Sequence, residues 1–253
     1  MEITFHGKTA MISGAAGYIG QQIAAGFASG GAEELILLDR KETLPALTEL
    51  ADRLGAETGT TVYTADLQRP EEIRSVGKCL RESGKHVDIL VNCAGINVLR
   101  RALSIDETVW DLLMNTNARG AFLLTRTVAE QSLLARQGTI IFISSQHGIV
   151  GNPERSAYCP SKAALLGLMR ALVAEWSRMG VRINTVSPTW VENDSNEAYL
   201  YSGTGRRTML GRIPIGRYAT AKDVADAVLF LASPKAAMIN GHNLVVDGGY
   251  TAL

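Results

Sequence analysis

The sequence has no excess of charge of either sign and contains few cysteines. Its 253 residues include 25 basic and 25 acidic side chains, and only Cys79, Cys93 and Cys159 carry thiols. Zero net charge removes any general attraction to nucleic acid or to an anionic membrane. Three scattered cysteines do not make a disulfide framework and lack the close pairs typical of zinc ligands. We therefore expect reduced thiols, no metal and no nucleic-acid partner.

Long apolar runs are also missing. No stretch reaches the length of a membrane span, and residues 1–8 lack the segments and cleavage site of a signal peptide. These absences predict a cytoplasmic protein with no membrane partner. Hydrophobic residues make up 46% of the chain, enough for a large core, and no linker rich in Gly, Pro or Ser divides it. We expect a single domain over residues 1–253.

Short β-type runs alternate with longer segments of helical apolar spacing. This alternation predicts an α/β fold, a doubly wound parallel sheet of the Rossmann type in a three-layer αβα arrangement. The predicted strands are 9–13, 35–39, 61–64, 89–92, 139–144, 182–186 and 243–246. The predicted helices are 21–29, 44–54, 71–82, 108–135, 156–178 and 222–231. Segment 189–217 fits neither pattern, and we expect it to form a substrate lid.

A glycine-rich turn, SGAAGYIG at residues 13–20, follows the first predicted strand. Three glycines between a strand and a helix let the backbone approach a pyrophosphate, which the N–H groups at the helix start can bind. A turn of this kind is weak evidence by itself. We expect cofactor contacts from Ser13, Gly14, Gly17, Tyr18, Ile19 and Gly20.

Asp39 strengthens the case for a dinucleotide. It ends the second predicted strand, 19 residues after Gly20. A carboxylate at this place accepts hydrogen bonds from the ribose hydroxyls of adenosine and repels a 2′-phosphate, which favours NAD over NADP. Arg40 could pair with such a phosphate, so NADP is the alternative cofactor.

Further turns follow the third and fourth predicted strands. Asp66 and Leu67 come after one, and Asn92, Ala94 and Gly95 belong to the NCAG turn after the other. Each could be an ordinary turn residue. Because ligands of doubly wound sheets bind at the carboxyl ends of the strands, their shared edge favours contact with the cofactor.

Tyr158 and Lys162 lie four residues apart, one helical turn, so both side chains leave the same helix face. Pro160 between them is tolerable only near the start of a helix. A nearby lysine lowers the pKa of a phenol, which suits Tyr158 to exchange a proton with an alcohol. Ser145 follows a strand and can hydrogen-bond the substrate oxygen. Without Ser145 and the glycine turn, we would interpret Tyr158 and Lys162 as part of an ordinary half-exposed helix face.

Together these motifs resemble the short-chain dehydrogenase/reductase family, in its compact branch, over essentially the whole chain. NARG at 117–120 and DGGY at 247–250 are further matches. The resemblance implies that Tyr158 is the general acid/base, that Lys162 lowers its pKa and holds the nicotinamide ribose, and that Ser145 positions the substrate oxygen. It also implies that Asn117 holds a water molecule that relays protons to Lys162. The residues alone equally allow Asn117 to be a buried asparagine that bridges backbone groups.

The resemblance also implies a homotetramer, with dimer faces on the predicted helices 108–135 and 156–178. One-sided burial against the sheet would explain the apolar residues of these helices equally well.

The chain departs from the family pattern in four places. The second glycine of the turn is Gly17, one position early, and Cys93 replaces an asparagine. After the sixth predicted strand, Thr189 replaces a glycine and Asn193 stands where a threonine is usual. We still expect the Val191 backbone and the Asn193 side chain to contact the nicotinamide carboxamide.

Polar residues surround the expected substrate pocket. The candidate contacts are Gln146, His147, Trp190, Arg206 and Arg207, with Arg212 also in the predicted lid. They favour a small sugar, sugar acid or polyol, and the arginines would suit a carboxylate, sulfonate or phosphate. Equally, the arginines could be a solvated loop face and His147 a structural residue.

We therefore predict an NAD-dependent oxidoreductase that moves a hydride between the cofactor and a secondary alcohol or ketone of a small-molecule substrate. One alternative is a 3-oxoacyl-(acyl-carrier-protein) reductase using NADPH, but Asp39 and the lack of a basic docking cluster argue against it. Another is a non-catalytic, dinucleotide-binding regulator. The presence of Ser145, Tyr158 and Lys162 argues against that reading.

Overall fold

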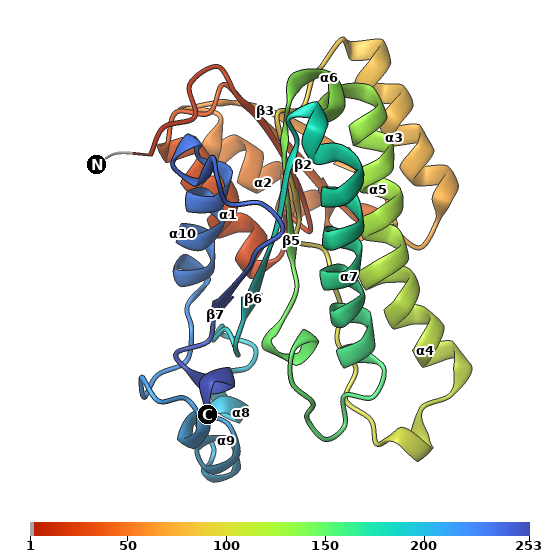
Figure 1. Cartoon of the computed structure of the whole chain (residues 1–253). Helices are drawn as coiled ribbons and strands as arrows, with labels where there is room; N and C mark the ends of the chain where they lie inside the picture. Colours follow the sequence, from red (N-terminus) through yellow and green to blue (C-terminus); the bar gives the residue numbers. More distant parts are fainter. Residues whose placement is uncertain (1–2) are drawn as a thin grey trace.

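The computed structural model describes residues 3–253, and its seven parallel strands form one sheet in the order β3-β2-β1-β4-β5-β6-β7 (Figure 1). This order, in which β1 lies inside the sheet between β2 and β4, confirms the predicted doubly wound α/β fold. The predicted strand ends differ from the observed ends by two residues at most. The strands are β1 (Thr9–Ser13), β2 (Glu34–Asp39), β3 (Gly59–Thr64), β4 (Ile89–Asn92), β5 (Thr139–Ile143), β6 (Arg182–Pro188) and β7 (Asn243–Val246).

The strands are apolar at consecutive positions because both faces of the sheet are covered. In β1, Ala10 and Ile12 belong to one buried cluster, whereas Met11 between them belongs to the other. Successive side chains of a strand point to opposite faces, so each face contributes every second residue to its own core. The single domain therefore has two hydrophobic layers, one on each side of the sheet.

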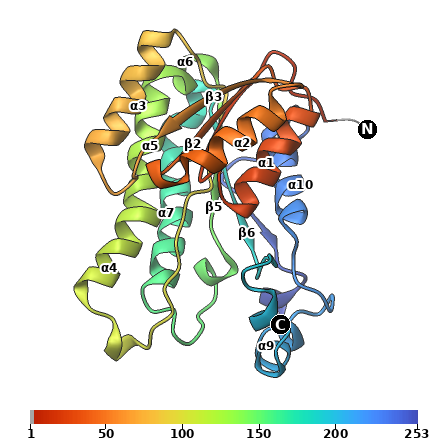
Figure 2. The same cartoon turned by 180° about the vertical axis from the view of Figure 1, so that it is seen from behind.

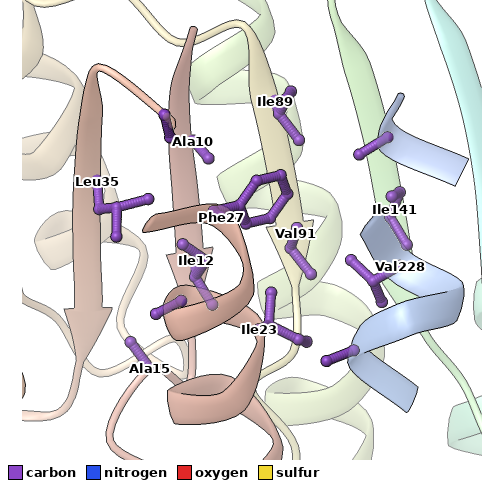
Figure 3. Close-up of a cluster of buried hydrophobic side chains, with 14 of the residues drawn as sticks. Ala10, Ile12, Ala15, Ile23, Phe27, Leu35, Ile89, Val91, Ile141 and Val228 are labelled. Atoms are coloured by element: carbon purple, nitrogen blue, oxygen red, sulfur yellow. The ribbon is translucent and has the colours of Figure 1, made fainter. Parts of the chain in front are cut away.

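Helices cover both faces of the sheet (Figures 1 and 2). One face carries α1 (Tyr18–Ser29), α2 (Leu44–Leu54) and α10 (Ala221–Ala232), and the other carries α3 (Pro70–Ser83), α5 (Ala121–Val128) and α7 (Tyr158–Trp176). Figure 3 shows Phe27 and Ile23 of α1 and Val228 of α10 against Ile12 and Val91 of the strands. No helix among residues 3–253 is long and apolar enough to cross a membrane.

The predicted helix 108–135 is interrupted. It consists of α4 (Glu107–Met114), α5 and α6 (Leu134–Arg136), joined by π-helical turns at Asn115–Gly120 and Ala129–Leu133. Single π turns widen a helix locally and often occur at functional sites. The first of these turns carries Asn117.

The segment predicted as a structureless lid contains short helices. These are α8 (Glu197–Leu200), α9 (Gly203–Thr208) and a 3-10 turn at Leu210–Arg212, and they lie beside the C-terminus at the carboxyl ends of β6 and β7 (Figure 1). Tyr218 anchors them, because its hydroxyl donates to the Leu200 carbonyl at 2.7 Å. The small core of the segment consists of Leu200, Met209, Ile213, Tyr218 and Tyr250.

Candidate active site

The glycine turn between β1 and α1 can only be built from glycines. Gly14 has φ +71°, and a Cβ there would lie 2.7 Å from the Ala94 backbone. A Cβ on Gly20 would lie 2.1 Å from the Gly14 carbonyl oxygen. Gly17 begins α1 without a side-chain cap, which leaves the first N–H groups of the helix for another acceptor. The turn is thus a cradle of the kind that binds a pyrophosphate.

A cavity of about 730 Å³ lies at this cradle and extends along the carboxyl ends of β1, β2 and β4. Two expected cofactor residues do not line it: Asn92 is buried and donates to Thr125 Oγ1 at 2.9 Å, and Lys162 borders an adjoining cavity. The expected residues that line it are Ser13, Gly14, Gly17, Tyr18, Ile19, Gly20, Asp39, Arg40, Asp66, Leu67, Ala94, Gly95, Tyr158, Val191 and Asn193.

Asp39 is held firmly at the end of β2. Its two carboxylate oxygens accept hydrogen bonds from the backbone N–H groups of Ala16, at 3.0 Å, and Arg40, at 2.8 Å. These bonds aim the negative charge at the cavity wall next to the glycine turn. The cradle and the carboxylate together fit a nicotinamide dinucleotide.

The second cavity, about 220 Å³, joins the cofactor groove to the start of α7 and is bordered by Ser145, Tyr158 and Lys162. Tyr158 is the first residue of α7, so Pro160 falls in its first turn, as predicted. The Ser145 hydroxyl is hydrogen-bonded to the Tyr158 phenol. The Lys162 ammonium donates to the Ile143 carbonyl at 2.9 Å and lies 6.0 Å from the centre of the Tyr158 ring.

The pKa of Tyr158 differs from the expectation. Burial raises it above the ordinary value, and the Ser145 hydrogen bond and the charge of Arg155 oppose that rise. Burial lowers the pKa of Lys162 to about 8. The charge of Lys162 is not among the causes that shift the pKa of Tyr158, and the ammonium is turned toward the Ile143 carbonyl. That Lys162 lowers the pKa of Tyr158 stays a prediction. Arg155 is the cation that acts on the phenol.

Asn117 connects the π turn to both sides of the site. Its side chain accepts from Ile96 N–H at 2.8 Å and donates to the Ile96 carbonyl and to Ser161 Oγ, each at 2.9 Å. It therefore ties the loop after β4 to α7. A Cβ on Gly95 would lie 2.9 Å from Lys162 Nζ and 3.3 Å from Asn117 Oδ1, so both side chains meet at this glycine.

A family model described as enoyl-(acyl carrier protein) reductase matches residues 14–251. The chain belongs to the short-chain dehydrogenase/reductase family. D-threitol dehydrogenase of Mycolicibacterium smegmatis is 36% identical over 97% of this chain and 93% of that protein. The 3-oxoacyl-(acyl-carrier-protein) reductase of Escherichia coli K12 is 34% identical over 98% of both chains.

Solved structures agree with this assignment. A gluconate 5-dehydrogenase of Burkholderia cenocepacia, crystallised with NADP and tartrate, has a TM-score of 0.92 at 30% identity, covering 99% of this chain and 97% of that one. The protein is accordingly an NAD(P)-dependent oxidoreductase that acts on CH–OH groups.

The substrate side of this short-chain dehydrogenase is a row of aromatic and imidazole rings. His147 lies 6.4 Å from Tyr158 between ring centres, Trp190 lies 5.4 Å from His147, and Tyr250 lies 5.2 Å from Trp190. Gln146 and His147 are only 1% and 5% exposed. The structure thus places the expected His147 and Trp190 in a row of rings that starts at Tyr158, with Gln146 buried next to His147 in the chain.

The two arginines expected to touch substrate lie elsewhere. Arg206 and Arg207 are exposed on α9. The Arg206 guanidinium lies over the Tyr201 ring at 5.6 Å and donates to the Tyr201 carbonyl. These contacts keep it on the outer surface of the segment.

Sequence reasoning missed two residues of the site, Arg155 and Tyr250. Arg155 is 6% exposed, and its Cζ lies 5.7 Å from the centre of the Tyr158 ring. The only signal in the sequence is a basic residue three positions before Tyr158. Tyr250 belongs to the DGGY motif, which marks the family without showing that its ring packs on Trp190.

Proposed function

We propose that this dehydrogenase interconverts a secondary alcohol and a ketone in a small polar substrate, namely a sugar, sugar acid or polyol. The observation that carries the proposal is a set of buried polar atoms without protein partners beside Tyr158. These are both amide atoms of Gln146, Trp190 Nε1 and the Tyr250 hydroxyl. Buried polar groups are normally hydrogen-bonded, and a substrate rich in hydroxyl groups supplies such partners, whereas an acyl chain does not.

The residues around Tyr158 divide the work of the reaction. The nicotinamide, when bound, accepts or delivers the hydride. The Tyr158 phenol exchanges the proton with the substrate oxygen, and the Ser145 hydroxyl hydrogen-bonds that oxygen. The backbone N–H of His147 donates to Ser145 Oγ at 3.1 Å and so holds the hydroxyl in place. Lys162 and Asn117 complete the proposed proton path behind the tyrosine.

NAD is the proposed cofactor, with NADP as the weaker one. The Asp39 carboxylate, fixed by two backbone N–H groups, puts a negative charge where the adenosine ribose of a dinucleotide lies. A 2′-phosphate at that place would be repelled. Arg40 also borders the cavity and offers a 2′-phosphate its one cationic partner there.

The proposal includes the lid and the assembly. Segment 189–217 contributes Val191 and Asn193 to the cofactor cavity and is proposed to close over the substrate. Trp110 of α4 and Phe122 of α5 are 42% and 37% exposed, which supports subunit faces on these helices and a homotetramer. Sedimentation of the purified protein measures the assembly state directly.

The test is a panel of substrates with each cofactor. The purified protein is mixed with NAD or NADP and with polyols, sugar acids or a 3-oxoacyl thioester, and nicotinamide absorbance is recorded. We expect NAD to be reduced by a polyol or sugar acid. The 34% identity with a 3-oxoacyl-(acyl-carrier-protein) reductase supports the second candidate, and turnover of the thioester alone would establish it. Cofactor binding without any turnover would establish the regulator instead.

The Tyr158→Phe variant is the matched control for this panel. Removing a general acid/base costs about 10²- to 10⁴-fold in rate. We expect that loss in kcat with cofactor binding retained, because the ring still fills its place beside Ser145. An unchanged kcat in this variant would show that Tyr158 takes no part in the proton transfer.

A further inference from the structure

Arg155 is a buried cation without a counter-ion. Arg155 is only 6% exposed, and its Nε atom is buried without a hydrogen-bond partner. Glu154 acts on it electrostatically, but none of the ion pairs within residues 3–253 includes Arg155. Burying an unpaired charge is costly, so a residue of this kind calls for a ligand of opposite charge.

The position of Arg155 indicates where such a ligand would lie. Its guanidinium carbon is 5.7 Å from the centre of the Tyr158 ring, and its charge lowers the pKa of both Tyr158 and His147. An anion bound by Arg155 would therefore lie within one small molecule's length of the reacting oxygen. A site at this distance selects substrates and does not serve the cofactor phosphates, which belong at the glycine turn.

A second cation stands at the other end of the ring row. The Arg212 guanidinium lies 4.4 Å from the centre of the Tyr250 ring, and its charge also lowers the pKa of His147. His147 itself has a pKa lowered to about 4, mainly by burial, so it is neutral at pH 7 and acts as a hydrogen-bonding group. Arg155 and Arg212 are thus the two cations that act on the neutral His147.

We propose that Arg155 binds the carboxylate of a small hydroxy acid beside Tyr158, with Arg212 as the second cation at the outer end of the site. The proposal rests on the function proposed above and narrows its substrate class from sugars, sugar acids and polyols to hydroxy acids. Nε and one terminal nitrogen of a guanidinium form a two-pronged donor that matches the two oxygens of a carboxylate. The unpartnered atoms of Gln146, Trp190 and Tyr250 are left for the substrate hydroxyls.

The test uses matched pairs of substrates that differ only in the acid group: glycerate and glycerol, threonate and threitol, gluconate and glucitol. For the wild type we expect the acid of at least one pair to have the higher kcat/KM. Truncating one partner of a buried charged pair costs enough to lower kcat/KM for the acid about 30-fold or more in Arg155→Met. We expect the value for the neutral polyol to change less than about 3-fold, and Arg155→Lys to restore part of the acid preference.

Thermal unfolding separates binding from a structural role. Without ligand, Arg155→Met removes an unpaired buried charge, so we expect an unchanged or higher Tm. The wild type should gain Tm with tartrate or threonate, and the variant should not. A lower Tm in the ligand-free variant, with the acid preference intact, would make Arg155 a structural residue and overturn the proposal.

The remaining variants locate the anion site. Arg212→Met should weaken the acid preference, and Arg74→Met, an exposed change on α3, should leave it unchanged. If Arg206→Met or Arg207→Met loses the preference for the acid while Arg155→Met keeps it, the anion site lies on α9 and the assignment to Arg155 is overturned. A preference for sulfonate or phosphate analogues over the carboxylates would overturn the ligand class.

Failure of the two proposals can be told apart. If neither member of any pair is turned over with NAD or NADP, the proposed function fails, and the Tm response to tartrate in wild type and Arg155→Met still decides the anion site. If polyols and acids are turned over equally and Arg155→Met treats them alike, the function stands and the anion site fails.

Discussion

The Tyr158 phenol is subject to opposing influences on its pKa. Burial raises the pKa, whereas the hydrogen bond from Ser145 and the charge of Arg155 lower it. A phenol with a raised pKa is protonated at neutral pH, which suits it to donate a proton when a ketone is reduced. Alcohol oxidation needs the deprotonated form, so its rate should increase with pH.

Substitution of Ser145 should move that pH dependence. The Ser145 hydrogen bond favours the phenolate, so Ser145→Ala raises the pKa of Tyr158 further. We expect the rise of kcat with pH in alcohol oxidation to shift to higher pH, together with a loss of about 10²-fold or more because the substrate oxygen loses its donor. A kcat–pH profile checks this. A profile that falls in amplitude without moving along the pH axis would contradict the role of Ser145 in setting the pKa.

His147 should make the protein less stable in weak acid. Its pKa falls from 6.5 to about 4 on folding, chiefly through burial and then through Arg155. The unfolded chain therefore binds the proton more tightly, and stability is lost as the pH falls through the window from 6.5 to 4. The slope from one such group is at most about 1.4 kcal/mol per pH unit. Urea unfolding at several pH values in this window measures it.

The control for this measurement is His147→Gln, which keeps polarity but does not titrate. We expect a flatter dependence of the free energy of unfolding between pH 4 and 6.5. Asp88 and Asp223 also have lowered pKa values, but carboxylates that start from 3.8 lose their contribution mainly below about pH 5, at the acidic end of this window and beyond it. Equal slopes in wild type and variant would show that His147 is not the titrating group.

At the scale of elements, α10 shows why some helices can be read from sequence. It was predicted as 222–231 and spans Ala221–Ala232, because apolar residues recur on one face and a strong start signal precedes them. Thr220 and Asp223 form a reciprocal capping box, in which each side chain accepts from the backbone N–H of the other. By contrast, α8 and α9 have four and six residues, too few to show a helical period.

Removing the cap of α10 should cost stability in proportion to one helix end. Thr220→Ala deletes the acceptor of the Asp223 N–H, and such changes cost about 1 kcal/mol in the free energy of unfolding. Thr48→Ala, which removes an exposed threonine within α2, is the matched control and should stay within about 0.5 kcal/mol of wild type. Chemical denaturation measures the free energy of unfolding of both variants. Equal losses in the two variants would show that the capping box does not stabilise the protein.

The candidate catalytic residues and the cofactor turn could be predicted from the sequence because their signals are local. The glycines, Asp39 and the Tyr158–Lys162 pair lie at fixed positions relative to strand ends or helix starts. The substrate side has no such signal. Tyr250 packs on Trp190, and Trp190 on His147, only because three distant loops gather at one edge of the sheet. For the same reason the sequence suggests the exposed Arg206 as a substrate contact and gives no sign of the buried Arg155.

For the molecule as a whole, the cofactor groove couples ligand binding to global stability. Its walls come from the carboxyl ends of β1, β2 and β4, from the start of α1 and from the segment after β6. These parts are far apart in the sequence and are assembled only in the folded protein. A dinucleotide that fills the groove therefore binds the folded state alone, and the binding free energy adds to the stability of the whole domain.

Cofactor choice should accordingly appear as a shift in Tm. At NAD concentrations 100 times the Kd the folded state gains about 2.7 kcal/mol, which raises the Tm of a domain of this size by about 5–11 °C. We expect NADP at equal concentration to give a smaller shift in the wild type, because Asp39 repels the 2′-phosphate. In Asp39→Asn the NADP shift should grow and the NAD shift should shrink, while Asp52→Asn, an exposed change on α2, should alter neither. A wild type stabilised more by NADP than by NAD would mean that Arg40, and not Asp39, governs the adenosine end of the groove.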